Sequence, residues 1–174
     1  MSDISNVRPA VIIGLGGTGQ WILTYVKKEL LEINGGEMPS NVRLLAFDTM
    51  PDADAATTQT GLADVEEEEV AIGSVKLEAG KEFVGLSGNG FELGRSVSNG
   101  HEPHIGSWFD ARYYRERAQP SLWDLATGAG QVRQFGRLGF YMKVDSEIWP
   151  RVSNAYKAVQ GEVSKGHELE VMII

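Results

Sequence analysis

The chain has 174 residues, no cysteine and a formal net charge of -8 at pH 7. This length suffices for one large domain with its own hydrophobic core, and the lack of cysteine excludes disulfides, thiolate metal sites and a cysteine nucleophile. The negative charge disfavours nucleic acids and anionic membranes as partners, and the short apolar runs without a signal peptide indicate a cytoplasmic protein that has no membrane span.

An apolar run followed by a glycine-rich turn dominates the start of the chain. Residues 10–14 predict a buried strand because adjacent β-branched residues favour extended backbone. The glycines of residues 14–20 allow a tight turn whose backbone N–H groups converge. A helix that begins near Thr18, with apolar spacing up to Ile33, places the positive end of its dipole at the same point. This turn is therefore predicted to hold phosphate.

The next elements complete a βαβ unit. Gly35 and Gly36 predict the end of the helix, and residues 42–47 predict a second strand that Asp48 closes. A helix between two strands indicates parallel pairing with a right-handed crossover. The predicted fold class is α/β, a Rossmann-like three-layer sandwich with a mainly parallel sheet.

The middle of the chain shows weaker patterns. Residues 70–77 predict a hairpin or edge segment, and residues 85–106 predict an irregular excursion. The aromatic and basic residues of 108–117 are typical of a packing segment in which arginine stems lie over rings. His101 and His104 flank a proline, which prevents helical ligand geometry, so no metal site is predicted.

A second glycine-rich turn at residues 128–131 precedes the last predicted elements. The apolar spacing from Ile148 predicts a helix that begins near Ser146, because Pro150 fits the first turn of a helix. Residues 169–174 predict another buried strand. Because the loops after parallel strands normally hold ligand groups, we expect the domain to be truncated here.

The first glycine motif by itself is typical of a dinucleotide site. Gly14, Gly16 and Gly19 satisfy the GxGxxG pattern of a Rossmann NAD(P)-binding oxidoreductase domain. The acidic residue of that fingerprint is expected about 20 residues further on, whereas Asp48 lies later in the chain. This interpretation also leaves the second glycine turn without a role. A non-catalytic interaction module is a further alternative.

Three loops taken in order resemble the nucleotide-binding half of the tubulin/FtsZ superfamily, and more narrowly the bacterial tubulin-like proteins. They are Gly-Leu-Gly-Gly-Thr-Gly-Gln at residues 14–20, Phe-Asp-Thr at residues 47–49 and Gly-Ala-Gly-Gln at residues 128–131. The resemblance implies that residues 1–174 are the N-terminal part of a GTP-binding domain that lacks its C-terminal activation domain. It also implies GTP or GDP with Mg2+ as the ligand, and self-association of the full-length protein into cytoskeletal protofilaments.

The resemblance also implies which residues bind nucleotide. In that superfamily the first loop approaches the α- and β-phosphates, the second lies near the phosphate and its metal, and the third borders the γ-phosphate. The implied nucleotide-binding residues are Gly16, Gly17, Thr18, Gly19, Gln20, Asp48, Thr49, Gly128, Ala129, Gly130 and Gln131. Arg133 and Arg137 either hold phosphate, fix the third loop or form structural salt bridges. No catalytic residue is assigned, and we expect no GTP hydrolysis by this chain alone.

Overall fold

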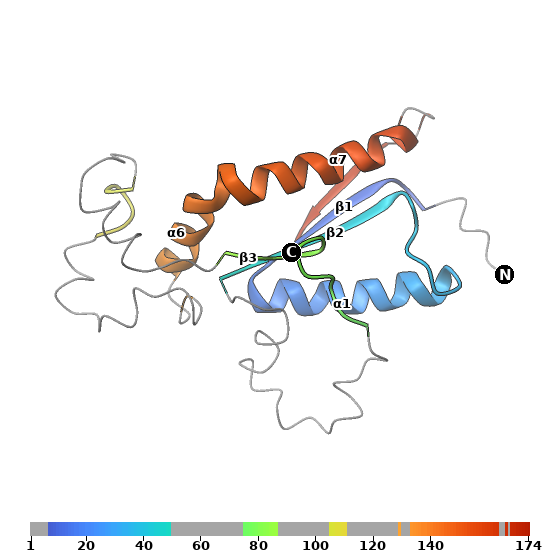
Figure 1. Ribbon diagram of the computed structural model, residues 1–174, viewed down its shortest axis with the longest axis horizontal. Helices are drawn as coiled ribbons and strands as arrows, with labels where there is room; N and C mark the ends of the chain where they lie inside the picture. Colours follow the sequence, from blue (N-terminus) through green and yellow to red (C-terminus); the bar gives the residue numbers. More distant parts are fainter. Residues whose placement is uncertain are drawn as a thin grey trace, which may run out of the picture.

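Four strands form a parallel sheet at the centre of the structure (Figure 1). The computed structural model describes residues 7–49, 75–86, 105–110, 129, 133–163, 166 and 168–174. Within these residues the strands are β1 (Ala10–Leu15), β2 (Val42–Asp48), β3 (Phe83–Gly85) and β4 (Glu170–Ile173). The helices are α1 (Gly16–Ile33), α6 (Arg133–Lys143) and α7 (Trp149–Val163), and a π-helical turn (Val144–Ile148) joins the last two. Every strand pair is parallel, which confirms the predicted α/β class.

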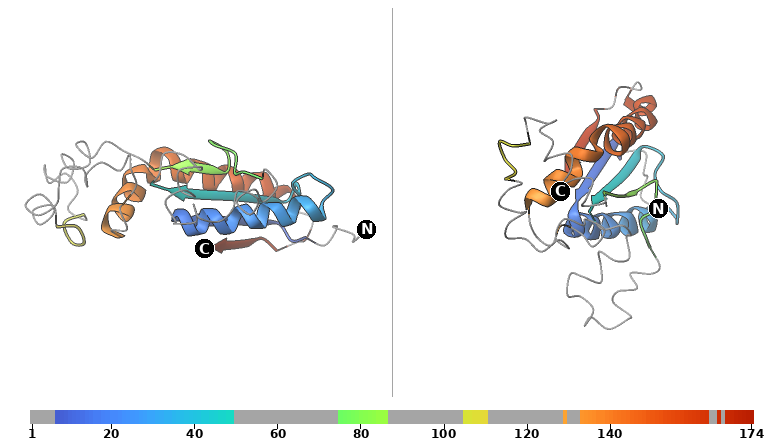
Figure 2. Two further views of the ribbon diagram at one scale, coloured as in Figure 1. Left: turned by 90° about the horizontal axis from the view of Figure 1, so that it is seen from below. Right: turned by 60° about the vertical axis from the view of Figure 1, so that its left-hand side comes forward.

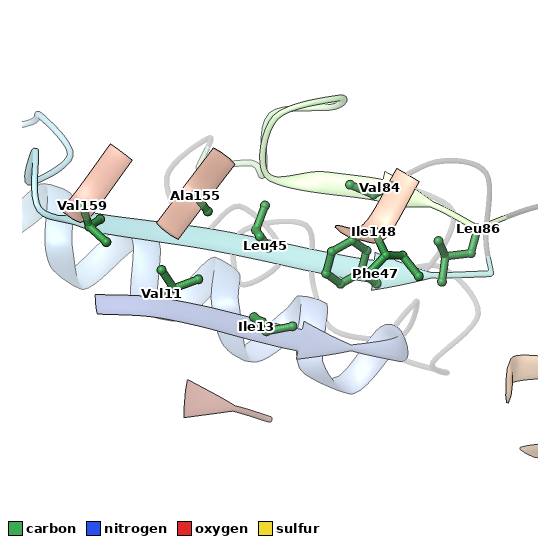
Figure 3. Close-up of a cluster of buried hydrophobic side chains, with 9 residues drawn as sticks. All are labelled: Val11, Ile13, Leu45, Phe47, Val84, Leu86, Ile148, Ala155 and Val159. Atoms are coloured by element: carbon green, nitrogen blue, oxygen red, sulfur yellow. The ribbon is translucent and has the colours of Figure 1, made fainter. Parts of the chain in front are cut away.

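The two long helices cover opposite faces of the sheet, which gives the predicted three layers (Figure 2). Side chains of β2 alternate between the faces, so that Leu45 and Phe47 face α7 while Leu44 and Ala46 face α1. The core on the α7 side contains Val11, Ile13, Leu45, Phe47, Val84, Leu86, Ile148, Ala155 and Val159 (Figure 3). The core on the α1 side contains Leu23, Val42, Leu44, Ala46, Leu77 and Phe83. Strands β1 and β2 are therefore buried on both faces, as is usual in parallel sheets.

The strand order β3-β2-β1-β4 places the first strand inside the sheet. From β1 the chain passes through α1 to β2 on one side, and it later returns through α7 to β4 on the other side. Because the direction along the sheet and the covered face both change, the two crossovers have the same hand. The carboxyl ends of β1 and β4 thus form a topological switch point, where open α/β sheets normally bind ligands.

Two glycines bring the start of α1 into direct contact with β1. A Cβ atom on Gly19 would lie 2.7 Å from the carbonyl carbon of Gly14, and one on Gly14 would lie 2.5 Å from the carbonyl oxygen of Gly19. The helix begins at Gly16, two positions before the predicted start, and Gly16 has a φ of 70° that side-chain-bearing residues rarely adopt. Packing and backbone geometry therefore both require glycine in this turn.

Polar side chains hold the short strand β3 in place. Lys27 Nζ of α1 lies 2.6 Å from Glu82 Oε2 and donates to the carbonyl oxygen of Lys76 at 2.7 Å. The side chains of Lys27 and Glu82 are only 9% and 14% exposed, so this ion pair is largely shielded from water. Arg151 of α7 donates to the carbonyl oxygen of Gly80. Helices on both sides of the sheet are thus tied to the segment that leads into β3.

The edge strand β3 corrects the prediction of an edge segment at residues 70–77. Residues 75–77 form no strand, and residues 70–74 lie outside the described part of the chain. The strand lies instead at residues 83–85, directly before the excursion that was predicted to be irregular, and shares only Gly85 with it. Three residues are too few to show a period of two, so sequence pattern alone does not reveal such a strand.

The helix that was predicted to begin near Ser146 is α7, which begins at Trp149, and it is preceded by α6, which begins at Arg133 and was not predicted. Glycines within α6 lower its intrinsic helix propensity, but burial of Phe135 and Leu138 against other parts of the chain outweighs this effect. Pro150 lies in the first turn of α7, directly after the π-helical turn, where its missing N–H group and its ring are tolerated.

The strand β4 is exposed, which contradicts the prediction of a buried strand at residues 169–174. Val171, Met172 and Ile173 are 60%, 51% and 66% exposed. The physical reason is that β4 pairs with β1 at the edge of the described sheet, and the two cores contain no buried residue from it. An apolar sequence is therefore not sufficient for burial, because burial also requires a layer that covers the strand.

We expect Gly19→Ala to lower the free energy of unfolding by about 2 to 3 kcal/mol, because the new methyl group overlaps the backbone of Gly14. Urea unfolding followed by circular dichroism measures this loss. Gly161→Ala is the matched control, since Gly161 lies in α7 with open space around it, and this change is expected to leave stability unchanged or raise it by up to about 1 kcal/mol. Equal stability of both variants would contradict the close contact.

We expect Lys27→Ala to cost about 3 kcal/mol of unfolding free energy, because it leaves the shielded carboxylate of Glu82 without its cation. Lys28→Ala is the control, because Lys28 pairs with the exposed Glu32 at 3.6 Å and such pairs contribute little. Its expected effect is below about 0.5 kcal/mol in the same denaturation experiment. If Lys27→Ala lowered the free energy of unfolding no more than Lys28→Ala does, the ion pair between Lys27 and Glu82 would not hold β3.

Candidate functional site

The first predicted loop lies where β1 ends and α1 begins. Leu15 stands at the N-cap position, where it provides no side-chain hydrogen bond, and the first turn of α1 contains no acidic residue. The first backbone N–H groups of a helix have no partner within the helix, and the helix dipole adds a partial positive charge there. The start of α1 therefore has the polarity that suits a phosphate group.

The residues of this loop differ in their exposure. Thr18 is exposed, Gly16 and Gly17 are half-buried, and Gly19 and Gln20 are buried. Gly19 lies against Gly14 of β1, so its environment is one of packing. The outward-facing part of the predicted first loop is thus the segment from Gly16 to Thr18.

The second predicted loop lies beside the first. In the parallel register of the two strands, Phe47 is paired with Leu15, so Asp48 and Thr49 follow at the same edge of the sheet. Both side chains are buried, and the backbone N–H group of Leu86 donates to the carbonyl oxygen of Asp48 at 2.5 Å. The Thr49 hydroxyl lies 3.4 Å from the carboxylate of Asp48. The end of β2 therefore presents two oxygen-bearing side chains close to the start of α1.

The third predicted loop reaches the end of β2 through Ala129. The backbone N–H group of Ala129 donates to Thr49 Oγ1 at 2.9 Å, although the two residues are separated by 80 positions in the sequence. Gly128, Gly130 and Gln131 lie outside the described residues. The structure thus brings the described member of the third loop to the same edge as the first two loops.

Helix α6, which follows the third loop, packs on a turn at residues 105–110. Ile105 and Phe109 of this turn are buried against Phe135 and Leu138 of α6. Figure 1 and the left view of Figure 2 show α6 beyond the carboxyl ends of the strands. Of the predicted packing segment, Trp108 and Phe109 pack in this core, Asp110 is exposed, and residues 111–117 lie outside the described part.

Arg137 of α6 provides the arginine that lies over a ring in this segment. Its guanidinium carbon is 4.2 Å from the centroid of the Trp108 ring. This arginine belongs to α6, whereas the arginines of the predicted segment, at residues 112, 115 and 117, lie outside the described residues. Of the roles considered for Arg137, this contact agrees with fixing the region of the third loop.

Gly14 contributes to the site, although it was not among the site residues predicted from the sequence. Gly14 was used as part of the GxGxxG pattern but not among the predicted site residues, yet its contact with Gly19 sets the position of the first loop. The signal was present, because in this pattern the first glycine serves the tight turn and the third serves close packing between helix and strand.

The described residues contain neither a cluster of metal-ligating side chains nor a helix that could cross a membrane. Among them, no group of three His, Asp or Glu side chains is arranged to hold a metal ion. His101, His104 and His167 lie outside the described residues, so the prediction about them is not tested. None of the described helices combines the length and the apolar character needed to cross a bilayer.

One comparison with known proteins identifies a relationship. The model of a protein family described as "Tubulin like" matches residues 11–173. This range includes all three predicted loops and, apart from Ala10 at the start of β1, all four strands. No significant match was found among curated proteins or among solved structures.

We expect Thr49→Val to increase the hydrogen-exchange rate of the Ala129 amide by about 10-fold, because valine keeps the shape of the side chain but removes the acceptor oxygen. Exchange measured by nuclear magnetic resonance tests this directly. Thr49→Ser keeps an acceptor and is expected to keep the protection. Equal exchange in all three proteins would show that Thr49 does not hold the third loop.

Proposed function

The chain belongs to the tubulin-like family, and we propose that it binds a guanine nucleotide, GTP or GDP, at the carboxyl edge of its sheet. The observation that carries this proposal is the hydrogen bond from Ala129 to Thr49, which joins the third loop to the second. The first loop lies on the neighbouring strand. The three loops that resemble the phosphate loops of the tubulin/FtsZ superfamily are therefore represented at one edge.

In this proposal the first loop binds the inner phosphates. The backbone N–H groups of Gly16, Gly17 and Thr18 donate to phosphate oxygens, and the dipole of α1 stabilises their negative charge. Gly19 and Gln20 support this loop from the buried side. Because the first turn of α1 has no acidic residue, no like charge opposes the phosphates there.

The second and third loops complete the phosphate site. Asp48 and Thr49 carry the oxygen donors that Mg2+ prefers, and Mg2+ when bound neutralises charge on the phosphates. Without a cation the carboxylate of Asp48 would repel a phosphate, so its place at this edge fits a nucleotide that arrives with Mg2+. Residues 128–131 border the terminal phosphate, with Ala129 held by Thr49.

The NAD(P) alternative retains one supporting observation. Asp48 lies at the carboxyl end of β2, where dinucleotide-binding folds place the acidic residue that binds the ribose. Ala129 reaches the same point, however, and a Rossmann dinucleotide site has no use for a second glycine-rich loop there. Membership of the tubulin-like family also favours the guanine nucleotide.

For the full-length protein, the proposal is supported only by membership of the tubulin-like family. Self-association into protofilaments and GTP hydrolysis in the assembled protein are properties that we propose for the whole protein, in the cytoplasm. For the described residues we assign no catalytic group, because hydrolysis requires a positioned water and charge stabilisation at the terminal phosphate. The contribution proposed for this chain is nucleotide binding.

Titration of labelled GTP and of NAD against the full-length protein tests the proposal. We expect saturable binding of GTP in the presence of Mg2+ and no response to NAD. Binding of NAD without binding of GTP would instead establish the dinucleotide alternative. Binding of neither ligand would overturn the proposal and leave the interaction module as the alternative.

Gly17→Val is expected to weaken GTP binding by at least about 100-fold, because a branched side chain in the first loop displaces the phosphate from two or more N–H donors. Gly161→Val is the matched control, since Gly161 lies on an exposed part of α7. Circular dichroism establishes that both variants are folded. Unchanged GTP affinity of folded Gly17→Val would remove the first loop from the site.

A further inference from the structure

The first half of α6 is held by its own small core. Phe135 and Leu138 pack against Ile105 and Phe109, and the rings of Phe109 and Phe135 meet edge to face at 5.6 Å. The contact between α6 and the main core comes later in the helix, where Phe140 packs on that core. The position of the beginning of α6 therefore depends on the turn at residues 105–110.

The contact between Arg137 and Trp108 lies on the outside of this small core. Trp108 is half-buried and its ring meets that of Tyr141 edge to face at 6.4 Å, while Arg137 is exposed and its guanidinium lies over the Trp108 ring. An arginine over a tryptophan ring joins the two segments by a cation–π interaction. Because Arg137 is exposed, its removal leaves the buried contacts of the core intact.

The same core also contacts the third loop. Ala129 packs against it as a half-buried residue, and a Cβ atom on Gly136 of α6 would lie 3.8 Å from the Cβ atom of Ala129. Ala129 is thus held on one side by α6 and on the other by Thr49. A shift of α6 relative to the turn at residues 105–110 would therefore change the position of this loop.

We propose that Trp108 and Arg137 are positioning residues that hold Ala129 in place and thereby give the site its preference for a nucleoside triphosphate over a diphosphate. This inference rests on the proposed function, in which residues 128–131 border the terminal phosphate. Ordering a loop costs conformational entropy, so a loop that is already held binds its phosphate more tightly. A nucleoside diphosphate lacks the terminal phosphate that this loop borders in the proposed site. Its affinity therefore gains little when the loop is held in place.

Hydrogen exchange of the Ala129 amide tests the positioning role without any ligand. In Arg137→Ala and in Trp108→Leu we expect exchange to be about three- to five-fold faster, the size that a partly exposed cation–π contact provides. Trp108→Phe retains a ring and is expected to restore part of the protection. Lys157→Ala removes an equal charge from the exposed surface of α7 and is expected to leave the exchange rate unchanged. Unchanged exchange in Arg137→Ala would overturn the inference.

Nucleotide affinity tests the second part. We expect Arg137→Ala and Trp108→Leu each to weaken GTP binding about three- to five-fold and to leave GDP binding nearly unchanged. The double variant should lose no more than Trp108→Leu alone, because Arg137 acts through its contact with the Trp108 ring. An equal loss of affinity for GTP and GDP would overturn the inference. A loss of GTP affinity in Arg137→Ala but not in Trp108→Leu would also overturn it, and would indicate that Arg137 contacts phosphate directly.

The two measurements separate this inference from the proposed function. If the wild-type protein binds no guanine nucleotide but the variants show faster exchange at Ala129, the proposed function fails while the positioning contact stands. If the wild-type protein prefers GTP and the variants keep both the preference and the exchange rate, the proposed function stands while this inference fails. Arg137→Lys adds a check, because its ammonium keeps a cation for the Trp108 ring but loses the planar stacking, so we expect an effect between those of the wild type and Arg137→Ala.

Discussion

The contact between Gly14 and Gly19 is the constraint on which the rest of the structure depends. Because neither residue has a Cβ atom, α1 approaches β1 directly and begins at its carboxyl end. This geometry places the positive end of the helix at the edge of the sheet, beside the end of the neighbouring strand β2. A larger residue at either position would move the helix outward and would separate the first loop from Asp48 and Thr49. The packing of one helix on one strand thus decides where a phosphate group can be held.

The two sides of the candidate site are held by different means. The first and second loops follow adjacent central strands, which are buried on both faces and are paired from Ala10 with Val42 to Leu15 with Phe47. The third loop is connected to them by the hydrogen bond from Ala129 to Thr49 and is supported from behind by α6 and the turn at residues 105–110. One side of the site is therefore part of the central sheet, whereas the other depends on a small separate core. This difference is the physical basis for expecting the terminal phosphate, rather than the inner phosphates, to be sensitive to changes around Trp108.

Local patterns predicted the elements that form from neighbouring residues. The strand, glycine turn and helix at the start of the chain were predicted to within about two residues, because backbone geometry, β-branching and helical periodicity act over short distances. Strand β3 was not predicted, because three residues are too few to show a period of two. The start of α6 was not predicted either, because its glycines lower the helix propensity of a segment that tertiary packing stabilises as a helix. The exposure of β4 shows the same limit, since hydropathy does not reveal whether another layer covers a strand.

The sequence by itself determined the α/β class, the parallel βαβ unit and the glycine-rich turn at the end of β1, because each follows from local steric and dipolar rules. It also supplied three loops in an order that resembles the tubulin/FtsZ superfamily, and the chain belongs to the tubulin-like family. Only the tertiary structure decided that Ala129 meets Thr49 and that Arg137 lies over Trp108. These contacts join residues that are distant along the chain, and no local preference specifies them. They arise from the way the small core around α6 docks at the carboxyl edge of the sheet.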